Sequence, residues 1–299
     1  MTCTHDVLPA HFTKHHPTLV YPFGTHVFYL AQLNDGTANG TALWLGAQCM
    51  SVFLVDAVRQ IKPKSQRRRP KAIELGSGVG LTALVLASLG WDTLATDIEH
   101  VTRSVLEQNV KQNTDSVHPD FGSVQVRVLD WTVHPESWTW NNPPTIASHS
   151  LHKPDSEFST PSNHDELFLP PFDLIVTSDT LYSPELITPL LRTIHHISME
   201  SIASTTSGQK GETSRGNGPP VYLALENRDP RLTQSFLEQA REVWKFSVER
   251  VPNRKVTKSL ERGSILWDKE DWAGVEIWKL SLRNVSVGES HDRPGDSIS

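Results

Sequence analysis

The stretch AIELGSGVGL, residues 72–81, decides the fold, because it runs from an apolar strand through three alternate glycines into an apolar helical segment. Glycine lacks a Cβ atom, so its backbone can turn sharply and approach a ligand closely. In open α/β sheets, nucleotide-like ligands bind where the carboxyl end of a strand enters such a turn. The stretch therefore predicts an open α/β sheet whose first strand ends at a ligand site.

The spacing of the glycines separates the classes of ligand. A dinucleotide fingerprint counted from Gly76 requires glycine at the position that Leu81 occupies, and a Walker phosphate loop requires a Lys-Ser/Thr pair that this loop lacks. What remains is an acidic residue, Glu74, followed by alternate glycines. This arrangement is similar to that of class I S-adenosylmethionine-dependent methyltransferases. A tight strand-to-helix turn that binds no ligand is the alternative.

Apolar, β-branched runs alternate with helical patterns along most of the chain. We expect seven strands, at residues 72–75, 91–95, 124–129, 173–177, 221–225, 246–251 and 275–282, and helices at 42–61, 81–89, 101–113, 184–200 and 230–244. The alternation predicts an α/β, Rossmann-like seven-stranded sheet, mostly parallel, with helices on both faces. No convincing helix joins the last two strands, so we expect them to form a C-terminal antiparallel hairpin at one edge.

The hydrophobic content of 37% is low for a globular chain, and the deficit is confined to polar segments. Residues 133–170 and 201–220 are interpreted as irregular insertions into a methyltransferase domain that spans 41–283. Residues 284–299 are expected to form a disordered tail. Residues 1–40 are expected to form an N-terminal extension with a β-hairpin, because 27–33 is a candidate strand followed by turn residues.

Further polar residues follow the second and third strands. Asp97 ends the second strand, where a carboxylate can accept both hydrogen bonds of a ribose diol, although a cap for the following helix is an alternative. Asp130 and Trp131 end the third strand in the same register and suit the edge and the face of adenine. Packing in the core is the alternative for Trp131.

Several motifs in the right order resemble the seven-β-strand, methyltransferase-like lysine methyltransferases of non-histone proteins. The resemblance covers about residues 41–282 and rests on ALW at 42–44, the glycine loop, TD at 96–97, LDW at 129–131, TSDTLY at 177–182 and ALENR at 224–228. The Asp-x-x-Tyr of Asp179 and Tyr182 is the most specific of these motifs. Ordinary structural roles stay open, as a buried aromatic for Trp44 and as a helix N-cap region for Asp179 and Tyr182.

The resemblance implies S-adenosylmethionine as the cofactor and a role for each matching residue. Asp179 and Tyr182 would stand where a lysine enters and would serve as the catalytic pair. Asp97 would hold the ribose. The other cofactor-binding residues would be Trp44, Glu74, Gly76, Ser77, Gly78, Asp130, Trp131 and Ser178.

Charge and cysteine content exclude other classes. The chain has 28 Lys and Arg against 34 Asp and Glu, a net charge of -6, so no overall field attracts nucleic acid. Cys3 and Cys49 form neither a disulfide framework nor a metal-ligand spacing, and we expect no metal. No apolar stretch is long enough to span a bilayer. We expect a monomer in the cytoplasm or, given the basic run 62–71, the nucleus.

The sequence therefore predicts an S-adenosylmethionine-dependent methyltransferase that modifies lysine in a non-histone protein. By the resemblance alone, the substrate would belong to the translation or chaperone machinery. A small-molecule methyltransferase and a non-catalytic, cofactor-binding partner protein are the alternatives, and a nicotinamide dehydrogenase is disfavoured by Leu81.

Overall fold

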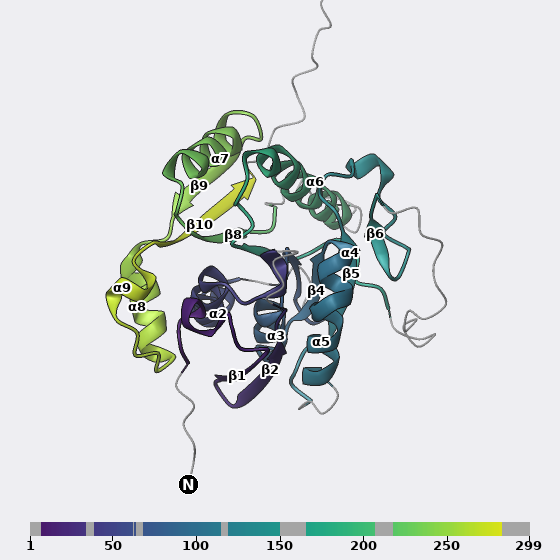
Figure 1. The fold of residues 1–299 in the computed structure, drawn as a ribbon. Coiled ribbons are helices and arrows are strands. Elements are labelled where there is room, and N and C mark those ends of the chain that lie inside the picture. The colour runs from purple at the N-terminus through teal and green to yellow at the C-terminus, as the bar shows by residue number, and fades with distance from the viewer. Residues whose placement is uncertain are drawn as a thin grey trace, which may run out of the picture.

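An eight-stranded sheet in the order β6-β5-β4-β3-β7-β8-β10-β9 forms the centre of the protein (Figure 1). The computed structural model describes residues 7–33, 39–61, 63, 68–114, 119–149, 166–206 and 218–282. The strands of the sheet are β3 (Lys71–Leu75), β4 (Asp92–Asp97), β5 (Val124–Leu129), β6 (Thr145–Ala147), β7 (Leu174–Ser178), β8 (Val221–Glu226), β9 (Phe246–Arg250) and β10 (Val275–Leu282). Strand β10 is antiparallel to both β8 and β9, and the other pairings of this sheet are parallel.

The predicted fold class, an α/β Rossmann-like sheet that is mostly parallel, is confirmed, with two differences in detail. The sheet gains an eighth strand, because β6 adds to its edge beside β5. The antiparallel pair β9–β10 is present, but α8 (Asn253–Arg262) and α9 (Lys269–Trp272) lie between its strands, where no helix was expected. Helix α8 was missed because only Val256 and Leu260 make its apolar stripe, and both are buried.

Helices cover both faces of the sheet because successive residues of each central strand point to opposite sides. Ala72 and Val176 face the apolar cluster formed with α2 (Leu45–Ala57) and α3 (Leu81–Ser88). Their neighbours Ile73 and Ile175 face the cluster formed with α6 (Ile187–Thr206) and α7 (Pro230–Glu242). In Figure 1 these two pairs of helices lie on opposite sides of the sheet.

A two-stranded hairpin, β1 (Thr18–Phe23) and β2 (His26–Ala31), packs beside α5 (Glu107–Thr114). Two asparagines of α5 bind the free edge of β2. Asn113 accepts from the backbone N–H of Tyr29 at 2.8 Å and donates to its carbonyl, and the buried Asn109 does the same for Ala31. Side-chain amides thus take the place of a third strand.

The remaining short segments are α1 (Ala10–Thr13), η1 (Asn39–Thr41), η2 (Val58–Gln60), α4 (Glu99–Val101), the π-helical η3 (Thr102–Leu106), η4 (Pro135–Ser137) and η5 (Pro184–Leu186).

The first part of the predicted irregular insertion 133–170 is ordered into η4 and β6 and packs on the core. Its Trp138 and Trp140 rings meet edge to face, with centroids 5.9 Å apart, against the α6 side of the sheet. The buried Arg127 donates to the carbonyl groups of Trp140 and Asn142, at 2.5 and 2.7 Å. Interpreting these residues as irregular was therefore wrong, because their aromatic side chains are half-buried against the core and their carbonyls have a fixed donor.

The predicted insertion 201–220 begins inside a helix, since α6 continues to Thr206. Ser201 is buried and Ile202 packs on the core, so the apolar face of the helix extends past residue 200. Residues 150–165 and 207–217, half of the basic run 62–71 and the predicted tail 284–299 lie outside the described residues.

Two kinds of feature are absent from the described part of the chain. None of its helices combines the length and the apolar content needed to cross a bilayer. The same residues bring together no group of three or more His, Cys, Asp or Glu side chains that could hold a metal ion.

Candidate functional site

One cavity of about 450 Å3 brings together every site residue that the sequence predicted. It lies at the carboxyl ends of β3, β4, β5 and β7 and is closed by the N-terminus of α2. Strands β4 and β7 flank β3, so the chain order reverses there, and such a reversal leaves a crevice at the strand ends. The predicted residues that line the cavity are Trp44, Glu74, Gly76, Ser77, Gly78, Asp97, Asp130, Trp131, Ser178, Asp179 and Tyr182.

The glycine loop is locked onto the neighbouring strand. The backbone N–H groups of Gly76 and Ser77 both donate to the carbonyl of Thr96 at 2.9 Å, and the Ser77 hydroxyl accepts from the Thr96 N–H at 3.1 Å. Gly76 has φ +72°, and a Cβ atom there would lie 2.5 Å from Thr180 Cγ2 and 3.2 Å from the Trp131 ring. Only glycine combines this backbone conformation with so close an approach of Thr180 and Trp131 to the loop.

Glu74 places a buried carboxyl group in the wall of the cavity. Its side chain is 1% exposed, and Oε2 has no hydrogen-bond partner among the described residues. Burial raises the pKa of Glu74 to about 8, and hydrogen bonding, chiefly from Ser77, offsets this only in part. A buried acid with a free oxygen costs stability, so its presence indicates a ligand that the structure is built to receive.

The Asp97 carboxyl group is held in one orientation by backbone donors. Its Oδ2 accepts from the N–H of Gly78 at 2.9 Å, and its Oδ1 accepts from the N–H of Ile98 at 2.8 Å. Burial nevertheless raises the pKa of Asp97 to about 6. Because each carboxylate oxygen has a second lone pair, both can still accept a hydrogen bond from a diol in the cavity.

The ends of β5 and β7 contribute polar atoms next to an aromatic surface. Asp130 accepts from the N–H and the hydroxyl of Thr132, at 2.9 and 2.6 Å, which fixes the turn that carries Trp131. Trp131 Nε1 and Ser178 Oγ are buried and have no partner among the described residues. The arrangement offers a flat ring and two unused polar atoms to a ligand.

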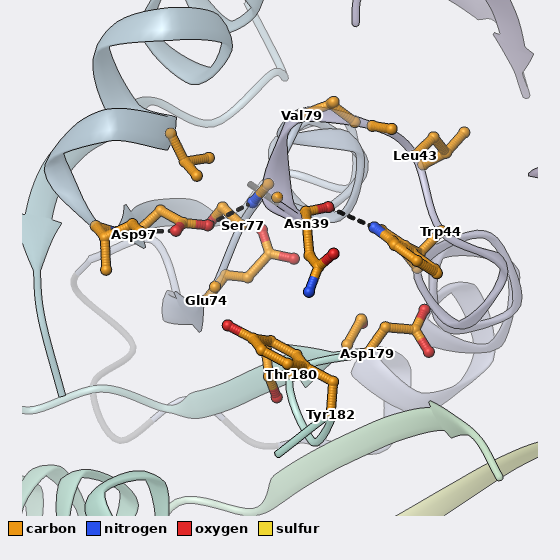
Figure 2. Close-up of a pocket in the computed structure, with 18 of the residues that line it drawn as sticks. Asn39, Leu43, Trp44, Glu74, Ser77, Val79, Asp97, Asp179, Thr180 and Tyr182 are labelled. Carbon is orange, nitrogen blue, oxygen red and sulfur yellow. Dashed lines mark hydrogen bonds between the residues drawn. The ribbon is translucent and has the colours of Figure 1, made fainter. Parts of the chain in front are cut away.

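Asp179 joins three elements at the opposite side of the cavity from Asp97, as Figure 2 shows. Its backbone has φ +55°, which is uncommon for a residue with a side chain, and its N–H donates to Ala224 of β8 at 2.9 Å. Its carboxyl oxygens accept from the N–H of Gly46, at the start of α2, and from that of Glu226, at 2.7 and 3.0 Å. Burial raises the pKa of Asp179 to about 6.

Aromatic side chains form the mouth of the cavity. Trp44 directly precedes α2, and its Nε1 donates to the carbonyl of Asn39 at 2.6 Å. Tyr182 is 58% exposed, and its hydroxyl end points away from Trp44, toward the side where Asp97 lies (Figure 2). The Asp97 charge, second to burial, raises the pKa of Tyr182. Tyr182 therefore lies at the mouth of the cavity, with Asp97 on one side of its ring and with Trp44 and Asp179 on the other (Figure 2).

Sequence reasoning missed residues that reach the site through tertiary contacts. Gly40 lies against the glycine loop, since a Cβ atom on Gly78 would be 3.1 Å from the Gly40 carbonyl oxygen. Gly46 lets Asp179 approach, since a Cβ atom there would lie 2.6 Å from Asp179 Oδ1. Thr180 shares a 2.6 Å hydrogen bond with Thr177 that fixes the turn after β7. No spacing in the sequence marks these contacts.

A family model described as "Lysine methyltransferase" matches residues 30–143. The chain is 29% identical over 112 residues to the protein-lysine N-methyltransferase rrg1 of Schizosaccharomyces pombe, covering 37% of this chain and 29% of that protein. It is 25% identical over 184 residues to the mouse protein N-lysine methyltransferase METTL21A, covering 61% of this chain and 66% of the relative. The alignment thus spans under two thirds of the length of each of these relatives. A methyltransferase structure from Pyrococcus furiosus is similar at a TM-score of 0.45 and 11% identity, covering 86% of this chain and 90% of that one.

Proposed function

We propose that this chain, whose residues 30–143 match the lysine methyltransferase family model, transfers a methyl group from S-adenosylmethionine to a lysine side chain of a protein. One observation carries the proposal. A single cavity has the glycine loop and Asp97 on one side and the acidic, aromatic pair Asp179 and Trp44 on the other. The first side suits a nucleoside, and the second suits a cation.

The residues of the cavity fit this cofactor. The absence of a Cβ atom on Gly76 lets Thr180 and the Trp131 ring lie against the glycine loop, and all three residues line the cavity. Glu74, Ser178 and Trp131 line the cavity, and each carries a buried polar atom that has no hydrogen-bond partner among the described residues. When bound, S-adenosylmethionine supplies a methyl group on a sulfonium centre, which is an electrophile with a good leaving group.

On the cofactor side of the cavity, the residues of the chain would bind the cofactor and fix its orientation. Asp97 presents two carboxylate oxygens, fixed by Gly78 and Ile98, to the hydroxyl pair of a ribose. The Trp131 ring, beside Asp130, offers a face for adenine to stack on. Glu74 holds a carboxyl group in a buried wall, where a nearby positive charge would favour its ionised form.

On the acceptor side, the chain attracts a cation and removes water from it. The Asp179 carboxylate and the face of Trp44 line the cavity and favour an ammonium group there, and the Glu226 carboxylate, whose charge acts on Lys14 at the Trp44 ring, adds negative charge nearby. A lysine with an ordinary pKa of ~10.4 is protonated at neutral pH and must lose a proton to water before its nitrogen can attack. Desolvation in the cavity lowers that pKa, so the main task of these residues is positioning rather than acid catalysis.

The finer expectations rest on the resemblance and on composition. We propose a substrate in the translation or chaperone machinery because the motifs at 177–182 and 224–228 resemble enzymes that modify non-histone proteins. We also propose that the chain acts as a monomer in the cytoplasm or nucleus, on the basis of its net charge of -6 and its few cysteines. Sedimentation velocity tests the first part of that statement, and imaging of the tagged chain in cells tests the second.

The experiment that tests the activity is transfer of label to protein in a eukaryotic cell extract. The purified chain is incubated with methyl-tritiated S-adenosylmethionine and the extract, and labelled proteins are hydrolysed to identify the modified amino acid. We expect methyl-lysine in wild type, loss of label and of cofactor binding in Asp97→Ala, and loss of label with cofactor binding retained in Asp179→Ala. Glu238→Ala, an exposed change on α7, is the matched control.

The other outcomes identify the alternatives. Label that appears only in small molecules would indicate a small-molecule methyltransferase. Cofactor binding with no transfer would indicate a non-catalytic partner protein. Binding of a dinucleotide but not of S-adenosylmethionine would contradict the proposal altogether.

A further inference from the structure

A lysine of the chain itself lies at the proposed entrance for the substrate lysine. Lys14 directly follows the short helix α1, and its Nζ lies 3.2 Å from the centroid of the Trp44 ring. Trp44 also lines the cavity, so one indole ring contacts this ammonium group and forms part of the wall of the site. The contact is of the cation–π kind that the mouth would offer to an incoming substrate lysine.

The charges around Lys14 are those of the acceptor side. Asp179 and Glu226 attract its ammonium group, while Arg228, whose Cζ is 5.1 Å from the same Trp44 centroid, repels it. Arg228 also pairs with the Glu226 carboxylate, which leaves that acid partly neutralised. Burial, followed by Arg228, lowers the pKa of Lys14. Lys14 is thus held among the groups that would bind a substrate amine.

A buried polar connection fixes this placement. The Gln32 side chain donates to the carbonyl groups of Thr13 and His16, on both sides of Lys14, at 3.0 and 2.9 Å. The same side chain accepts from the N–H of Leu43, the residue before Trp44, at 2.6 Å. One buried amide therefore ties the backbone around Lys14 to the backbone beside Trp44.

A second glutamine anchors the preceding helix to α2. The buried Gln48 accepts from the N–H of Ala10 at 2.7 Å and donates to the carbonyl of Leu8 at 2.9 Å. Because the backbone on both sides of Lys14 is held in place, only rotation about the side-chain bonds of Lys14 can move its amine. A lysine stem is long enough to carry Nζ several ångströms from the mouth of a cavity toward its interior.

We propose that Lys14 is a self-methylation site of this protein, an acceptor kept at the entrance of its own cavity by Trp44. The inference rests on the proposed function. In the step, the Nζ lone pair forms a bond to the methyl carbon, the methyl–sulfur bond breaks with its electron pair going to sulfur, and Nζ loses one proton to water. The methylated ammonium keeps its charge and adds apolar surface, so it stays on the Trp44 ring.

The placement is tested without cofactor. The amines of the full chain are dimethylated with 13C-formaldehyde and a borane reductant, and the methyl signals are recorded by NMR. A methyl group above an indole ring is shifted upfield, so we expect one signal upfield of the other lysine signals. That signal should be missing in Lys14→Arg and should rejoin the others in Trp44→Leu. The absence of a displaced signal would overturn the proposal.

The modification is tested by incubating the purified full chain with S-adenosylmethionine and no other protein, followed by peptide mass spectrometry. We expect a gain of one or more methyl groups on Lys14 in wild type, no gain at this position in Lys14→Arg or Asp97→Ala, and an unchanged gain on Lys14 in Lys258→Arg, the matched control on α8. Unmodified Lys14 together with labelled extract proteins would overturn this inference and leave the proposed function intact. Absence of cofactor binding would overturn both.

Discussion

The buried Glu74 carboxyl group predicts a specific dependence of stability on pH. Its side chain is 1% exposed, and burial raises its pKa from an ordinary value of 4.5 to about 8. The folded state therefore holds this proton more tightly than the unfolded state. The sign follows from linkage, since a group with a raised pKa in the folded state loses stability as pH rises from the unfolded pKa to the folded one.

The magnitude can be worked out between pH 5.5 and 7.5. With folded and unfolded pKa values of about 8 and 4.5, the free energy of unfolding should fall by about 2 to 3 kcal/mol over this interval because of Glu74 alone. Glu74→Gln cannot ionise, so this part of the pH dependence should disappear. If glutamine replaces the protonated acid without other change, the variant should be more stable than wild type by about 1 kcal/mol at pH 5.5 and by about 4 kcal/mol at pH 7.5.

Urea unfolding of the chain without cofactor measures the effect. Urea titrations of wild type and Glu74→Gln are recorded at both pH values, and the contributions of all other titrating groups to the pH dependence cancel in the comparison. Glu238→Gln, at an exposed position on α7, controls for the loss of one carboxylate and should follow wild type. Equal pH dependence in wild type and Glu74→Gln would refute the assignment of Glu74 as a buried acid maintained at a cost in stability.

Three further results are expected. Gly46→Ala places a methyl group against the Asp179 carboxylate, so methyl transfer should fall by about 100-fold with cofactor affinity unchanged in calorimetry, and unaltered transfer would contradict the role of this contact. Asn109→Leu removes buried hydrogen bonds to the backbone of Ala31, and urea unfolding should show a loss of about 3 kcal/mol, whereas a loss under 1 kcal/mol would speak against this anchoring of the hairpin. Because the pKa of Asp97 is about 6, its carboxylate becomes protonated between pH 7 and pH 5, and cofactor affinity should fall about tenfold over this range. The same fall in affinity in Asp97→Asn would show that Asp97 does not cause it.

The cofactor side of the site could be predicted because its residues follow strand ends in the sequence. Glu74, Asp97 and Asp130 lie at or next to the carboxyl ends of three neighbouring parallel strands, and parallel strands bring these ends to one edge of the sheet. Apolar strands and alternate glycines are local signals. The structure gathers these residues in one cavity, while their individual roles stay predictions until binding is measured.

The rest of the site depends on contacts between distant segments, which no local pattern reveals. Gly46 must be small only because Asp179, far along the chain, approaches it. Lys14 reaches the mouth only because Gln32 fixes its backbone. Likewise, a polar run was interpreted as irregular because the buried Arg127, which binds its carbonyls, lies outside that run. The amino-acid composition of a segment gives its average polarity, but it does not show which of its polar atoms form hydrogen bonds in the folded protein.

The most direct test of the central claim is a calorimetric titration of S-adenosylmethionine into the purified chain and into Gly76→Ala. In this variant the added Cβ atom would lie 2.5 Å from Thr180 Cγ2, in the wall of the cavity. The account predicts binding of one cofactor molecule per chain in wild type and no measurable binding in Gly76→Ala, with circular dichroism showing that the variant stays folded. Binding to a folded Gly76→Ala with the affinity of wild type would place the cofactor elsewhere and contradict the account.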